Sequence, residues 1–145
     1  MLKTCIHYLP IAIREPHNYE ARANLMWTGS LALNGLLEAG KNSDWATHDI
    51  EHELSALYDV THGLGLAILT PHWMRHVLSA DTAPKMAQYA RNVWGISEDD
   101  DIKAADSGIA RTAAFFNSLG LAASLKEIGV QPEYLEEMAR HAVSL

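Results

Sequence analysis

Three histidines within fifteen residues are the first candidates for chemistry in this sequence. His48 and His52 stand four positions apart, so on a helix both side chains project from the same face. His62 follows a short turn, at the expected start of the next helix. Neutral imidazole is the commonest metal ligand in proteins, and a helix hairpin can bring side chains at this spacing together. The cluster therefore favours a metal site over three unrelated surface or core histidines.

The same residues also form the pattern H-x-x-E-H at 48–52. In inverted zinc peptidases this pattern supplies two histidine ligands and a general base, which here is Glu51. A third, carboxylate ligand must then come from later in the chain, where the candidates are Glu127, Glu133, Glu136 and Glu137. The other interpretation of Glu51 is a surface carboxylate to which Ser55 contributes nothing. A metallopeptidase-like hydrolase therefore stays open as an alternative.

Other motifs point to structure rather than chemistry. His72 and His76 repeat the i, i+4 spacing, but no further ligand type stands near them, so we expect structural or surface roles. Gly63 and Gly65 do not form a dinucleotide-binding loop, since no strand precedes them and a third glycine is missing. Three aspartates at 99–101 suit the N-terminus of a helix. The four tryptophans are expected to be core or interface aromatics.

The elements that must position these residues are helices. Apolar residues recur with helical periodicity almost throughout, and neither strand alternation nor an Asn-Gly hairpin is evident. We predict an all-α protein of about seven helices with short connections. The predicted ranges are 2–14, 19–39, 44–58, 62–79, 82–94, 97–119 and 132–143, with residues 41–43 as a connection. Ser43 or Asp44 is expected to cap the third helix, and Pro71 to bend the fourth.

Size and charge limit the classes of function. The chain has 145 residues, 48% of them hydrophobic, so it can form one domain over 1–145 with an ordinary core. A net charge of −7 argues against nucleic acid and against an anionic membrane surface as partners. No apolar run has the length of a membrane span. A single cysteine excludes a disulfide framework, and we predict a cytoplasmic protein.

Several stretches together resemble a known family. The segment WATHDIEHELSALYDVTHGLGLAILTPHWM is similar to the C-terminal helical domain of the iron-containing (group III) alcohol dehydrogenases. The upstream YEARANLMWTGSLALNGLLEAG and the later MAQYARNVWGI and TAAFFNSLGL are similar to the same domain, in the same order. The resemblance covers essentially the whole chain and is nearest to the butanol dehydrogenase and NAD(P)H-dependent aldehyde reductase branch.

The resemblance implies a site and a reaction. Family members have a dehydroquinate synthase-like fold of two domains, with Fe²⁺ or sometimes Zn²⁺ held by one aspartate and three histidines. By the resemblance, His48 and His62 are the last two of those histidines, and His52 is the active-site histidine that does not bind the metal. The implied reaction interconverts an alcohol and an aldehyde with NAD(H) or NADP(H). The substrate is expected to be a small alcohol or aldehyde.

The sequence departs from the family in one respect. No nucleotide-binding domain is recognised, and the Asp-x-x-x-His pattern of the first two ligands is missing, since His7 is preceded by Lys3. We therefore expect a C-terminal fragment that is inactive alone and whose partner is the missing N-terminal domain. We also expect a homo-oligomer, because truncation exposes apolar surface. A non-catalytic helical interaction module is the third hypothesis.

Overall fold

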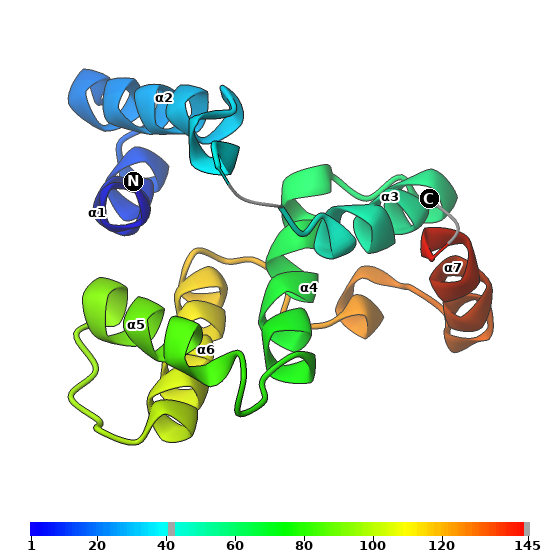
Figure 1. Cartoon of the computed structure of the whole chain (residues 1–145). Helices are drawn as coiled ribbons and strands as arrows, with labels where there is room; N and C mark the ends of the chain where they lie inside the picture. The colour runs from blue at the N-terminus through cyan, green and yellow to red at the C-terminus, as the bar shows by residue number, and fades with distance from the viewer. Residues whose placement is uncertain (41–42, 144–145) are drawn as a thin grey trace. The chain divides into compact units, whose positions relative to one another are not determined.

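The computed structural model describes residues 1–40 and 43–143, and within them it contains helices and no strand. The α-helices are α1 (Leu2–Arg14), α2 (Tyr19–Leu33), α3 (Ala46–Tyr58), α4 (His62–His76), α5 (Ala83–Trp94), α6 (Asp101–Ser118) and α7 (Leu135–Ala142). Three short 3-10 helices are η1 (Leu36–Glu38), η2 (Leu125–Ile128) and η3 (Pro132–Tyr134). Figure 1 shows their order along the chain. The predicted all-α class, with about seven helices, is confirmed.

Two predicted helix ends were too late. Helix α2 stops at Leu33 rather than near residue 39, because the Asn34 side chain accepts a hydrogen bond from the amide of Leu36. Gly35 follows with φ of 81°, a left-handed conformation that glycine adopts without strain. Helix α4 ends at His76 rather than residue 79, and the Thr82 hydroxyl donates to the carbonyl of Val77 in the turn that follows.

The start of α3 was predicted nearly correctly. The Asp44 side chain accepts a hydrogen bond from the amide of Ala46 at 2.8 Å, although Trp45 is the residue that immediately precedes the helix. Of the predicted connection at 41–43, residues 41 and 42 lie outside the part of the chain that the structure describes.

The chain divides into two compact units, residues 1–43 and 44–145. In the first unit α1 packs against α2. Asn18 caps α2 by accepting from the amide of Ala21. The Tyr8 hydroxyl donates to the Glu20 carboxylate at 2.9 Å, and this hydrogen bond raises the pKa of Tyr8 above its usual value. A contact between side chains twelve positions apart thus joins the two helices.

In the second unit, helices α5 and α6 approach each other closely because small residues line the contact. Ala87, Ala90, Ala104 and Ala105 are buried. A Cβ atom added at Gly108 would lie only 2.5 Å from the Cβ atom of Ala90. The absence of a side chain at Gly108 therefore sets how near the two helices can come.

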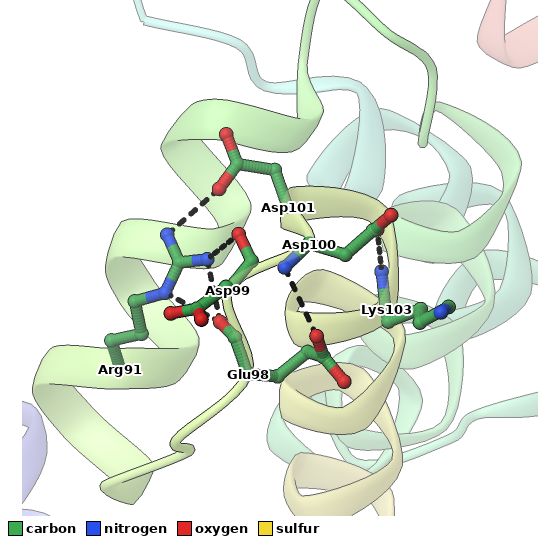
Figure 2. A network of polar contacts seen from close by, with 6 residues as sticks. All are labelled: Arg91, Glu98, Asp99, Asp100, Asp101 and Lys103. Carbon is green, nitrogen blue, oxygen red and sulfur yellow. Dashed lines mark hydrogen bonds and ion pairs between the residues drawn. The ribbon is translucent and has the colours of Figure 1, made fainter.

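The loop between α5 and α6 is held by one arginine (Figure 2). Arg91 donates to the backbone carbonyls of Glu98 and Asp99 and to the Asp101 carboxylate at 2.7 Å. Asp100 caps α6 by accepting from the amide of Lys103. The predicted cap in this aspartate run is Asp100, and the helix begins at Asp101 rather than at the predicted residue 97.

An apolar cluster lies where α3 packs against α7. Leu54 and Met138 are buried together with Val130, and partly buried apolar side chains surround them. The Tyr58 hydroxyl accepts a hydrogen bond from the amide of Gln131 at 3.1 Å. Helix α3 also packs against α4, so it is held on two sides.

The close approach at Gly108 can be tested by adding one methyl group. We expect Gly108→Ala to lower the free energy of unfolding by about 1–3 kcal/mol, because the methyl group overpacks the contact with Ala90. Chemical denaturation followed by circular dichroism measures this change. Gly29→Ala in α2 is the control, since nothing lies within 4 Å of its added Cβ atom. Equal stability of the Gly108→Ala variant and the original chain would show that the contact is not tight.

Candidate metal centre

The structure brings together all three histidines that the sequence singled out. His48 and His52 lie one turn apart on α3, and His62 is the first residue of α4. The ring centroids of His48 and His62 are 5.2 Å apart, those of His52 and His62 5.4 Å, and those of His48 and His52 6.4 Å. One potential ligand atom from each ring lies within 4.8 Å of the other two. Helices α3 and α4 thus form a three-histidine group.

The geometry of the three-histidine group fits a divalent ion. Nitrogen ligands about 2.1 Å from a tetrahedral ion lie roughly 3.4 Å from one another, and the candidate ligand atoms here all lie within 4.8 Å of one another. His52 and His62 are exposed and His48 is partly buried, so an ion has a route to the rings. Imidazole nitrogens suit both Fe²⁺ and Zn²⁺. Among the described residues, the group that could hold a metal ion contains these histidines and no carboxylate.

Beside the His62 ring lies Glu51, which is fully buried. One carboxylate oxygen, Oε2, contacts Nδ1 of His62. The other, Oε1, accepts a hydrogen bond from the Ser55 hydroxyl at 2.5 Å, and that hydroxyl also lies 2.9 Å from the carbonyl oxygen of Val60. The interpretation of Glu51 as a surface carboxylate without help from Ser55 was therefore wrong. Ser55 stands only four positions away on the same helix, but His62 is eleven positions away on the next helix, so local sequence could not reveal that contact.

Trp45 is a neighbour of the site that the sequence did not assign to it. Its ring centroid lies 4.7 Å from that of His48, with the ring planes tilted by 57°. The Trp45 carbonyl also accepts the amide hydrogen bond of His48. With 45% of its surface exposed, Trp45 is not a core residue. Its position three residues before His48 at a helix start was the available signal.

The other candidates lie elsewhere. His72 and His76 line an apolar hollow of about 300 Å³ with Trp73 and are not part of the three-histidine group. Of the glutamates proposed as a third ligand, Glu127 accepts from Ser124 and the amide of Ala123, and Glu136 pairs with Arg140. Structural or surface roles were expected for His72 and His76, and both side chains are exposed.

Comparison with known proteins decides the family. The sequence matches the family described as "Fe-containing alcohol dehydrogenase family, C-terminal" over residues 1–145. This chain belongs to that family. The resemblance predicted from the sequence is therefore confirmed, and the match covers the C-terminal part of the family's proteins.

Individual relatives support the family assignment. The chain is 52% identical to NADH-dependent butanol dehydrogenase A of Clostridium acetobutylicum over 144 residues, which are 99% of this chain and 37% of that protein. It is 39% identical to the NADPH-dependent aldehyde reductase YqhD of Escherichia coli, over 99% of this chain and 38% of that protein. The chain thus spans just over a third of the length of these relatives.

Solved structures show the same fold. The crystal structure of YqhD from E. coli K-12 matches with a TM-score of 0.91 at 38% identity, over 99% of this chain and 36% of that one. NADH-dependent butanol dehydrogenase A of Thermotoga maritima matches with a TM-score of 0.90 at 34% identity, again over 99% and 36%. In the described part of the chain, no helix is both long enough and apolar enough to cross a membrane.

The buried hydrogen bond to Glu51 makes a prediction about stability. We expect Ser55→Ala to lower the free energy of unfolding by about 1–3 kcal/mol, because it leaves Oε1 of Glu51 buried without a donor. Ser118→Ala is the matched control, since that exposed hydroxyl donates to a backbone carbonyl at the end of α6. Denaturant titration of both variants measures the difference. Equal losses in the two variants would mean that the Ser55 hydrogen bond contributes nothing specific.

Proposed function

We propose that residues 1–145 supply the metal-binding part of a dehydrogenase that interconverts an alcohol and an aldehyde with NAD(H) or NADP(H). The observation that carries the proposal is the three-histidine group at the α3–α4 junction, in a chain of the Fe-containing alcohol dehydrogenase family. The names of the butanol dehydrogenase and aldehyde reductase relatives support a small alcohol or aldehyde as substrate and a nicotinamide cofactor.

In this proposal His48 and His62 hold Fe²⁺ or Zn²⁺. His62 binds through Nε2, because its Nδ1 faces Glu51. His48 is oriented by the adjacent Trp45 ring, and its ring centroid lies 5.2 Å from that of His62. When bound, the ion supplies Lewis acidity toward an alcohol or carbonyl oxygen.

We assign proton exchange to His52. An aldehyde oxygen gains a proton when it is reduced, and an alcohol oxygen loses one when it is oxidised. The His52 ring is exposed and lies 5.4 Å from that of His62, so it can reach an oxygen held near the metal. Imidazole can both donate and accept a proton. The nicotinamide carries the hydride, and we place its binding mainly outside residues 1–145.

The hydrolase alternative fits the geometry poorly. A general base must reach the water molecule that it activates. Glu51 is fully buried, and both of its oxygens face side chains of the protein, His62 and Ser55. The carboxylate is thus engaged under the three-histidine group rather than open to a substrate.

Three further parts of the proposal concern the chain as a whole. We propose that residues 1–145 alone are inactive, because His48 and His62 provide only part of a coordination sphere. We propose a homo-oligomer in the cytoplasm. Exposed apolar side chains such as Trp27 and Leu33 on α2 favour association with other protein surfaces. Light scattering at high concentration tests the oligomer.

Metal titration is the first test of the site. We expect the purified chain to bind Zn²⁺ or Fe²⁺ weakly and at one site under reducing conditions. His48→Ala and His62→Ala should each weaken binding at least about tenfold, because each removes a ligand. Isothermal titration calorimetry measures the affinities. His72→Ala is the control, as an exposed histidine outside the three-histidine group. Equal effects of all three substitutions would favour a non-catalytic helical module instead.

The role of His52 can be tested in a protein that also supplies the nicotinamide-binding part. Residues 1–145 can replace the matching segment of butanol dehydrogenase A of C. acetobutylicum, to which they are 52% identical. We expect the chimera to reduce butanal with NADH, and His52→Ala to lower kcat by about 10²–10⁴-fold because proton transfer is lost. Its metal content should stay unchanged. A parallel loss of metal would instead make His52 a ligand.

A further inference from the structure

Glu51 is not one of the residues grouped at the proposed metal site, but it contacts His62, one of the proposed ligands. We propose that Glu51 is a positioning residue: its carboxylate accepts the Nδ1–H of His62 and thereby turns Nε2 of that ring toward the metal. The inference rests on the proposed function, because it concerns the same site. In this inference the metal affinity depends on Glu51, although Glu51 is not itself a ligand.

The burial of Glu51 is the first argument. A carboxylate inside a protein is strongly destabilising unless its oxygens find hydrogen-bond donors. Glu51 is fully buried, and both oxygens have partners: Oε2 contacts His62 Nδ1, and Oε1 accepts from Ser55 at 2.5 Å. With both oxygens engaged, the carboxylate has a single orientation. It therefore presents a fixed acceptor to the His62 ring.

The second argument is the space made for this side chain. A Cβ atom added at Gly65 would lie 2.5 Å from Oε1, 2.6 Å from Cγ and 2.9 Å from Cδ of Glu51. The missing side chain at Gly65 thus leaves the space that the carboxylate occupies beside α4, and an added Cβ atom would displace it. Gly63, two positions earlier in the same helix, has nothing within 4 Å of an added Cβ atom. Of the two glycines, only Gly65 is required by Glu51.

The third argument is the freedom of the ring itself. His62 has 47% of its side-chain surface exposed, so packing alone does not fix its orientation. A histidine ligand needs one ring nitrogen without a proton, and the hydrogen bond of the other nitrogen decides which one that is. Carboxylates in this position typically raise metal affinity 10–100-fold by orienting the ligand. Glu51 is placed to do this for His62.

Two substitutions at Glu51 separate positioning from packing. Glu51→Met fills similar space but removes the acceptor, and the Ser55 hydroxyl can still donate to Val60. Glu51→Gln keeps a neutral oxygen acceptor and should restore part of the effect. Gly65→Ala should displace Glu51 and act like Glu51→Met. Gly63→Ala is its matched control and should behave like the unsubstituted chain.

Each variant is examined in two ways at one fixed pH. The Zn²⁺ affinity is measured by competition with a chromophoric chelator. Two-dimensional NMR of the metal-free chain, labelled with ¹⁵N-histidine, identifies the His62 tautomer. We expect the Nδ1–H tautomer in the unsubstituted chain. Glu51→Met should weaken Zn²⁺ binding 10–100-fold and shift His62 toward the Nε2–H tautomer.

The outcomes are distinguishable. An unchanged affinity and tautomer in Glu51→Met would overturn the inference, even if that variant were less stable. If the unsubstituted chain bound no Zn²⁺ at all, the proposed metal site would fail in this chain. The tautomer would still decide about Glu51: Nε2–H in the unsubstituted chain overturns the inference, and a shift on Glu51→Met supports it.

Discussion

The contact between the buried Glu51 carboxylate and the His62 ring joins α3 to α4 at the three-histidine group. A buried carboxylate is tolerated only with partners on both oxygens, so its position restricts the two helices at once. Gly65 must be small for α4 to lie against this side chain, and Ser55 must supply the second hydrogen bond. Three residues, Glu51, Ser55 and Gly65, thus serve to hold the His62 ring.

Helix α3 buries one side and leaves the adjacent side more open. The buried side carries Glu51, which faces α4, and Leu54 and Tyr58, which pack in the apolar cluster shared with α7. These three residues stand at positions i, i+3 and i+7, so they share one side of the helix. The adjacent side carries His48, which is partly buried, and His52, which is exposed. An open metal group is therefore compatible with a rigid support.

The sequence predicted the helices well because their signals are local. Apolar periodicity placed all seven α-helices, and the Asp100 cap follows from its position before α6. The end of α2 was missed because a glycine commonly follows a helix, and both Gly35 and Gly40 could mark its end. Only the hydrogen bond that the Asn34 side chain accepts selects the first of them. The histidines were found from spacing. The burial of Glu51 was not, because it depends on where α4 lies, and an exposed and a buried glutamate look alike in a helical pattern.

The chain offers a metal at most three nitrogen ligands from the three-histidine group, and fewer if His52 is kept for proton exchange. Any further ligand must come from water, from substrate or from residues beyond the group. Catalytic metal sites keep such positions open, whereas structural sites close them. An incomplete site is useful only if its geometry is set before the remaining ligands arrive, since ordering a loose ring would weaken binding. The buried carboxylate beside His62 meets that requirement, because both of its oxygens are engaged by side chains of the chain itself.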